Sequence, residues 1–461
     1  MEFPYGKAPF AILLMAIVTG ALVLVTHAKF SRSRADLVLA THARAHADVY
    51  RERLADFEKA HGVRVEIQEV EYNALRPRLQ AAMLAGTEVP DLVELPEDLS
   101  FFARGPVGDI GFVDLTDWVN QKHLMDRMVA NRFSGWTTRG HIFALPHDVH
   151  PIMLAYRADI IEGQMGIDVS KIETWDDFVT VAKRVTGGAG SAHHYALELT
   201  ADGQYFLAML LAQRGGGLFD TEGKVIFDST LAVDTVIWYV HQIGGSNPIA
   251  FDPGTGAGSG QEMWRSILDG LVLFYFAPDW RTRQIALYAP GVAGKMKLMP
   301  LPAWEKGGRH TTSWGATGLA VSKSSRHLDL ALELAEYLYV NQTDGGESAS
   351  KLHIIPPVKE IWKSSVFDRP DPFFSNQPIM RLYTQYAPEV PAIWTTPYSN
   401  KAEEKLRESL INAARYFSSH GEVGLRDFVT KELKRNADYI RQQMDRNRLY
   451  GEAETKVTSD K

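Results

Sequence analysis

Short apolar stretches alternate with helical ones along the first part of the chain after residue 35. Residues 63–70 alternate apolar and polar side chains as a half-buried strand does, and residues 36–41 and 90–95 are apolar strands. Between them, residues 48–61 and 75–83 carry apolar side chains at helical spacing. Strand, helix, strand, helix, strand is typical of a right-handed βαβ unit. The order predicts an α/β fold with mainly parallel sheets flanked by helices.

The composition limits the classes of protein that remain. The chain has 461 residues, of which 45% are hydrophobic, which suits two or three lobes of about 150 residues each. A formal net charge of −7 argues against a nucleic-acid-binding protein. The absence of cysteine excludes a disulfide framework, a thiolate metal site, a cysteine nucleophile and a lipid-modified N-terminal cysteine. P-loop, dinucleotide-binding and Gly-x-Ser-x-Gly motifs are also absent from the sequence.

The N-terminus carries a long apolar stretch. Residues 8–28 contain no formally charged side chain, and residues 26–28 resemble a small-residue cleavage site. About 20 apolar residues can also span a bilayer, so residues 1–35 are either a signal peptide or an N-terminal membrane anchor. We favour the signal peptide, and no other stretch is long enough to span a membrane. Residues 448–461 form a polar tail.

Several local patterns follow one another along the chain. They are Gly-His-Ile-Phe-Ala-Leu-Pro at 140–146, Thr-Trp-Asp-Asp-Phe at 174–178, Gly-Gly-Gly-Leu-Phe at 215–219, a strand ending in Trp at 270–280, and Trp-Gly-Ala-Thr-Gly-Leu-Ala-Val at 314–321. In this order they resemble the extracellular solute-binding proteins of ABC importers, in particular the sugar-binding branch, family 1. The resemblance runs from about residue 36 to about residue 432. Residues 154–159 depart from the family's crossover strand at three positions.

This resemblance implies a hinged periplasmic binding protein with two lobes. Lobe 1 would comprise residues 36–150 and 311–352, and lobe 2 residues 151–310 and 353–447. Such a protein, in the periplasm or at the outer face of the cytoplasmic membrane, captures a carbohydrate by hinge closure. It then delivers the ligand to the permease subunits of an ABC transporter. We expect a monomer that is not an enzyme, with no cofactor and no metal.

Ligand contacts are expected in a cleft beyond the carboxyl ends of the strands, where the family also places them. Carboxylates suit sugar hydroxyls, and flat aromatic faces suit sugar rings. Trp280 and Trp314 match the family's motifs best, whereas His147 and Asp148 replace its usual aromatic neighbours. The candidate substrate-binding residues are Arg44, His46, Glu97, Asp98, His147, Asp148, Trp280, Arg281, Trp314 and Gly315.

Other interpretations of these residues stay open. The two tryptophans could pack in a core, Arg281 could form a surface ion pair, and Glu97 or Asp98 could cap a helix. A glycoside hydrolase would use Glu97 or Asp98 with Asp148 as an acid/base pair. A metal or metal-chelate receptor would become the sharper hypothesis if His46 and His147 converged across the cleft.

Overall fold

The computed structural model describes residues 35–187, 194–246, 248–253, 260–341 and 344–447, together with Met15, Ala16 and Thr19. The apolar stretch at 8–28 and the polar tail at 448–461 therefore lie almost wholly outside the described residues. Among the helices that the structure describes, none has the length and hydropathy that a bilayer crossing needs.

The first lobe is built on a five-stranded sheet with the order β2-β1-β3-β12-β6. The strands are β1 (Leu37–Thr41), β2 (Val65–Glu69), β3 (Leu92–Pro96), β6 (Leu145–Pro146) and β12 (Thr317–Val321). As the βαβ pattern predicts, β1 pairs in parallel with both β2 and β3. The late strand β12 inserts antiparallel between β3 and β6, so the segment after residue 310 returns to this lobe.

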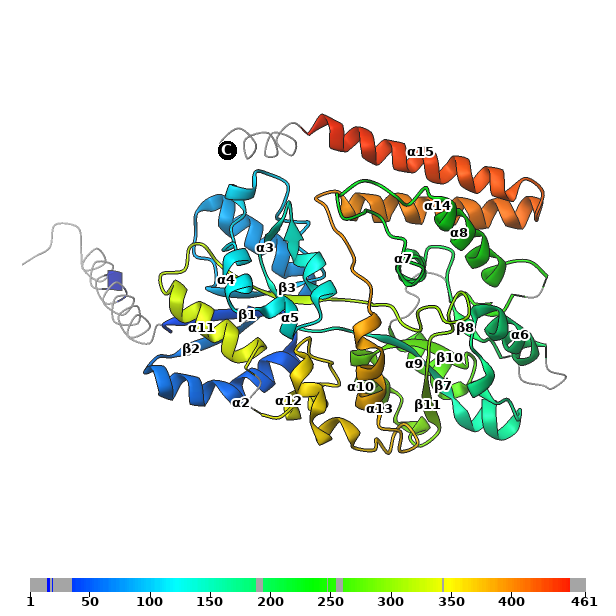
Figure 1. The fold of residues 1–461 in the computed structure, drawn as a ribbon, viewed down its shortest axis with the longest axis horizontal. Helices are drawn as coiled ribbons and strands as arrows, with labels where there is room; N and C mark the ends of the chain where they lie inside the picture. Colours follow the sequence, from blue (N-terminus) through cyan, green and yellow to red (C-terminus); the bar gives the residue numbers. More distant parts are fainter. Residues whose placement is uncertain are drawn as a thin grey trace, which may run out of the picture.

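Helices cover the first sheet (Figure 1). They are α2 (Arg44–His61), α3 (Tyr72–Ala85), α4 (Thr116–Gln121), α5 (Leu124–Arg127) and α11 (Leu328–Tyr339). Helix α2 ends at Gly62, whose φ of 66° is easy for a residue without Cβ. It begins at Arg44, earlier than the apolar spacing predicts. Residues 44–46, which precede the helix predicted at residues 48–61, form the first helical turn.

The second lobe holds a three-stranded sheet with the order β10-β7-β11. Its strands are β7 (Ile152–Arg157), β10 (Phe274–Pro278) and β11 (Met296–Pro300), and β7 pairs antiparallel with both neighbours. The expectation of mainly parallel strands thus describes β1, β2 and β3 but not this sheet. Two short pairs complete the strands, β4 (Thr137–Thr138) with β5 (His141–Ile142) and β8 (Leu197–Glu198) with β9 (Ala250–Phe251).

Helices also surround the second sheet. They are α6 (Trp175–Thr186), α7 (Gln204–Gln213), α8 (Thr230–Ile243), α9 (Gly260–Asp269), α10 (Asp279–Tyr288) and α13 (Ile379–Tyr386). Helix α12 (Glu347–Leu352) lies between the lobes and contacts α2. The sequence predicts Thr174 as the N-cap of α6. The structure shows a full capping box, in which Thr174 Oγ1 accepts from the Asp177 N–H at 3.2 Å and Asp177 Oδ2 accepts from the Thr174 N–H at 2.9 Å.

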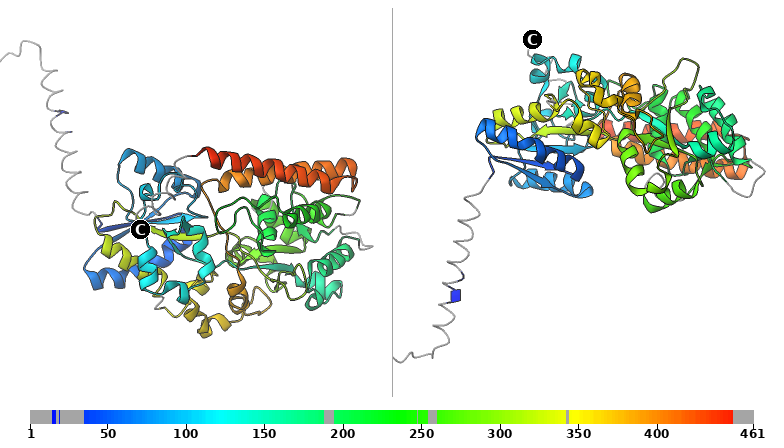
Figure 2. Two further views of the ribbon diagram at one scale, coloured as in Figure 1. Left: turned by 45° about the horizontal axis from the view of Figure 1, so that its top comes forward. Right: turned by 90° about the horizontal axis from the view of Figure 1, so that it is seen from below.

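A long helical hairpin follows, α14 (Ser399–His420) and α15 (Leu425–Arg446). Figures 1 and 2 show it lying along α7 and α8, with its far end reaching toward the first lobe. Leu406, Leu410 and Leu433 are buried in the same apolar core as Val236 and Tyr239 of α8. This packing fixes the position of α14, one face of which borders the space between the lobes.

The chain crosses between the lobes at residues 147–151, 301–316 and 353–358. These crossings lie against one another, because the Val149 N–H donates to Ile355 O at 2.9 Å and the Ile152 N–H donates to Thr312 O at 3.1 Å. A molecule with two lobes joined by a few adjacent crossings can hinge there.

Candidate functional site

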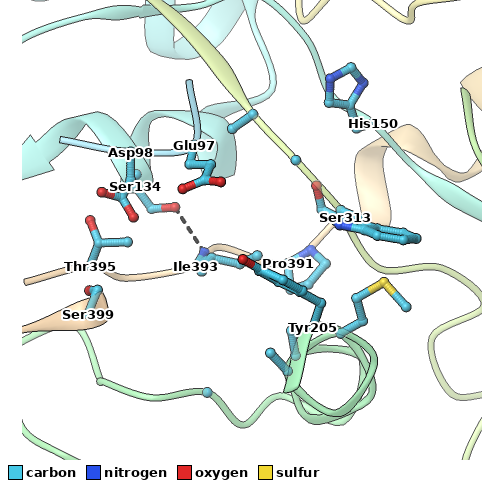
Figure 3. Close-up of a pocket in the computed structure, with 18 of the residues that line it drawn as sticks. Glu97, Asp98, Ser134, His150, Tyr205, Ser313, Pro391, Ile393, Thr395 and Ser399 are labelled. Carbon is cyan, nitrogen blue, oxygen red and sulfur yellow. Dashed lines mark hydrogen bonds between the residues drawn. The ribbon is translucent and has the colours of Figure 1, made fainter. Parts of the chain in front are cut away.

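A cleft of about 1180 Å³ lies between the two lobes. The first lobe contributes residues from the ends of β1 and β3 and from the segment around Ser134, and the second contributes residues of α7 and α10. The linker before α14 also lines it. In Figure 3 the Ile393 N–H of that linker donates to Ser134 Oγ, a bond of 2.9 Å.

One wall of the cleft is aromatic. The indole N–H of Trp280 donates to the carbonyl of Trp314 at 3.2 Å, and the two rings meet edge to face with 5.8 Å between their centroids. The guanidinium of Arg281 lies over both rings, 4.7 Å and 4.9 Å from their centroids. Arg281 is only 4% exposed, so it is a buried side chain and not a surface ion pair. Burial lowers the pKa of Arg281 to about 10, at which it remains a cation at neutral pH.

The opposite wall carries carboxylates. Tyr72 donates to Glu97 Oε1 at 2.6 Å, and Arg76 donates to Glu97 Oε2. Asp98 accepts a hydrogen bond from the Ser100 N–H at 2.7 Å. The bond stabilises a turn, because no α-helix begins at Asp98. Glu403 of α14 faces this pair from the other side. Its burial, and then the charges of Asp98 and Glu97, raise the pKa of Glu403 to about 8.

A buried ionic network stands behind the cleft at the crossings. Asp148 Oδ1 lies 3.1 Å from an Arg132 nitrogen, and Asp148 Oδ2 lies 3.0 Å from His150 Nε2. Although burial by itself raises the pKa of Asp148, His150, His147 and Arg132 together hold it well below its usual range. Asp148 therefore organises the hinge as a buried anion. It is not among the residues that the structure shows lining the cleft.

A second buried group lies at the first-lobe edge of the cleft. The ring centroids of His46 and His147 are 4.2 Å apart, and His46 Nδ1 lies 3.2 Å from Glu94 Oε2. Burial raises the pKa of Glu94, but the neighbouring imidazoles outweigh it and the net pKa is lowered. Burial, and then the proximity of His46, lowers the pKa of His147. The group therefore combines an ionised carboxylate with a neutral imidazole of His147 at neutral pH.

The structure places seven of the ten candidate residues in the wall of the cleft: His46, Glu97, Asp98, Trp280, Arg281, Trp314 and Gly315. The other three lie outside the lining among the described residues. Arg44 is exposed in the first turn of α2, and Asp148 is buried in the hinge network. His147 lies beneath the wall, against His46. Ligand contact itself stays a prediction for the seven.

Sequence reasoning missed three groups of this region. Glu94 was read as part of an apolar strand, although a lone carboxylate in the all-buried strand β3 is itself a signal of a buried polar group. The spacing of His150 from His147 suggested only a possible metal ligand, and its bond to Asp279 joins distant segments of the chain. Glu403 gave no signal, because the carboxylates that face it are also distant along the chain.

The family model for bacterial extracellular solute-binding proteins matches residues 44–344. The chain is a bacterial extracellular solute-binding protein. This family membership confirms the resemblance drawn from the sequence motifs, and the two-lobe architecture confirms the predicted fold class.

This solute-binding protein is similar to two curated proteins named arabinooligosaccharide-binding protein. It is 24% identical to that of Halalkalibacterium halodurans, over 82% of this chain and 84% of the relative. It is 26% identical to that of Bacillus subtilis, over 77% of this chain and 80% of the relative. Among solved structures, the sugar-binding protein MalE of Xanthomonas citri superimposes with a TM-score of 0.70 at 18% identity, covering 89% of this chain and 99% of that one.

Proposed function

We propose that this solute-binding protein captures an oligosaccharide outside the cytoplasm and delivers it to the permease of an ABC importer. The observation that carries the proposal is the composition of the cleft walls. Trp280 and Trp314 offer apolar faces to a sugar ring, and Glu97 and Asp98 offer acceptors to its hydroxyls.

The size of the cleft supports an oligosaccharide over a single sugar. Its volume of about 1180 Å³ exceeds the roughly 300–1000 Å³ of an ordinary small-molecule pocket. The names of the two arabinooligosaccharide-binding relatives agree with this, and arabinose oligomers are accordingly the first ligands to test.

Closure of the lobes is the proposed mechanism. The cleft is lined from both lobes, so a bound sugar contacts both walls only when they approach, and it stabilises the closed state by that difference in affinity. The ligand leaves chemically unchanged. Asp148, the proposed partner of Glu97 or Asp98 in a hydrolase, is held by Arg132 and His150. A family of extracellular binding proteins fits a periplasmic or cell-surface location.

Titration calorimetry with arabinose and its oligomers of increasing length tests the proposal. We expect stoichiometric binding of oligomers, weaker binding of the monosaccharide, and a smaller radius of gyration in solution scattering when the protein is saturated. Chromatography of the recovered ligand should show it intact. Binding of none of a panel of oligosaccharides, or cleavage of the ligand at catalytic protein concentrations, would overturn the proposal.

A further inference from the structure

Three side chains of the first lobe bring potential metal-ligating atoms together in one place. His46 lies in the first turn of α2, Glu94 in the middle of β3, and His147 directly after β6. Each offers one ligating atom, and these three atoms all lie within 4.8 Å of one another. They converge within one lobe and not across the cleft.

We propose that His46, Glu94 and His147 bind one divalent transition-metal ion of the zinc class. Two imidazoles and one carboxylate are a ligand set typical of zinc, with a fourth position left to water. From the sequence, no metal was expected, although convergence of His46 and His147 would favour one; Glu94 was not a candidate because it lies within an apolar strand.

The spacing of the ligating atoms fits such an ion. Metal–ligand bonds of about 2.0–2.1 Å place two tetrahedral ligands about 3.3 Å apart. His46 Nδ1 lies 3.2 Å and 3.3 Å from the two oxygens of Glu94. All three ligating atoms lie within 4.8 Å of one another, so the remaining adjustment is at most about 1.5 Å.

The surroundings of the group also resemble those of a metal site. Metal-binding carboxylates and imidazoles are usually held by further hydrogen bonds. Tyr339 donates to Glu94 Oε1 at 2.5 Å, and Tyr50 and Thr41 donate to the same carboxylate.

An ion pair between His46 and Glu94 alone does not explain why His147 is buried beside them. Its Nδ1 is buried and has no hydrogen-bond partner among the described residues, although Asp148 Oδ2 lies 3.4 Å away. The His147 side chain is only 11% exposed, and its ring lies 4.2 Å from that of His46. Two imidazoles repel each other when charged, whereas a cation between them uses both lone pairs. His46 also borders the cleft, which gives an ion a path from solvent.

The experiment uses the full chain without an affinity tag, treated with EDTA, desalted and titrated with Zn²⁺. We expect one Zn²⁺ per chain by calorimetry and by metal analysis. Co²⁺ in its place should give the visible absorption bands of a tetrahedral nitrogen and oxygen site. His46→Gln and His147→Gln should each weaken the affinity by at least about 100-fold, and Tyr339→Phe by about 10- to 100-fold.

His141→Gln is the matched control, because His141 also pairs with a carboxylate, 2.6 Å from Asp114, but is 43% exposed and stands outside the group. It should keep the affinity of the wild type. Circular dichroism identifies any variant that fails to fold. The Co²⁺ spectrum of the wild type tests the metal site without relying on any variant. The proposal fails if the wild type takes up no stoichiometric ion, or if folded His46→Gln and His147→Gln bind zinc as it does. None of these measurements requires a sugar, so they are independent of the proposed transport function.

Discussion

His150 and Asp279 form a buried ion pair at the crossing between the lobes, with 2.6 Å between Nδ1 and Oδ1. The second ring nitrogen of His150 lies 3.0 Å from Asp148, so one imidazole joins two carboxylates. The other oxygen of Asp279 accepts from the Ile355 N–H of a different crossing at 2.7 Å. The pair thus connects separate passages of the chain at the hinge.

We predict that the free energy of unfolding falls as the pH rises through about 9. Burial lowers the pKa of His150, but Asp148 and Asp279 outweigh it and raise the pKa to about 9. A raised pKa means that the folded state holds the proton more tightly. The protonated His150 therefore contributes about 3 kcal/mol to the free energy of unfolding. This contribution is complete below about pH 6.5 and is lost between about pH 6.5 and 9. Urea unfolding across this range measures it.

His150→Gln should remove most of this pH dependence and should be less stable than the wild type at pH 6. The control is His61→Gln, which breaks a more exposed pair with Glu333 and should cost at most about 1 kcal/mol. An unchanged pH profile in a folded His150→Gln protein would contradict the prediction.

The aromatic wall gives a second prediction, which rests on the proposed function. Trp280→Ala should weaken oligosaccharide binding by about 1–3 kcal/mol, because a stacking face at the cleft is lost. Calorimetry measures the affinity, and thermal unfolding shows whether the fold is kept.

Trp264→Ala is the matched control for this loss of an indole. Trp264 packs on Tyr288 with 5.2 Å between the ring centroids and is not among the described residues that line the cleft. Its removal should lower stability without changing affinity. Equal affinities for Trp280→Ala and wild type would remove Trp280 from the ligand site.

The strands were largely predictable because burial on both faces leaves a continuous apolar run. Residues 36–41 and 90–95 were expected as strands, and the structure has β1 at Leu37–Thr41 and β3 at Leu92–Pro96. The pairing direction of the second sheet was not predictable, because hydrophobic periodicity reports burial and contains no information on which segment lies beside which.

The walls of the cleft were predictable only in part. Trp280 and Glu97 follow strands, where ligands of α/β proteins gather, so their positions could be expected. The helix with Glu403 reaches the cleft through the packing of Leu406 and Leu410 against α8, a long-range contact that no local pattern encodes.

Glu403 leads to a third prediction. Its pKa is raised to about 8, so the folded state binds a proton that the unfolded state releases above about pH 4.5. Stability should therefore decrease as the pH rises from about 4.5 to 8. Glu403→Gln, which is neutral at all pH values, should be about 1–3 kcal/mol more stable than the wild type at pH 9 and about equal to it at pH 4.

The neighbouring variant Glu404→Gln controls for the loss of one negative charge on α14. Glu404 is 55% exposed and pairs with Lys401, so its replacement should change stability little at any pH. Chemical unfolding at pH 4 and pH 9 compares the two variants. A Glu403→Gln protein no more stable than Glu404→Gln at pH 9 would show that the pKa of Glu403 is not raised in the folded state.

A last prediction concerns the contact of β12 with the wall of the cleft. A Cβ on Gly318 would lie 2.4 Å from Cε2 of Trp136, a side chain that is 1% exposed. Neither the indole nor β12, which is paired on both sides, can move away easily. Gly318→Ala should therefore lower the free energy of unfolding by about 1–3 kcal/mol. Gly108→Ala adds the same methyl group where no atom lies within 4 Å, and it should be nearly neutral. If both variants unfold at the same denaturant concentration as the wild type, the close packing of Trp136 on β12 is wrong.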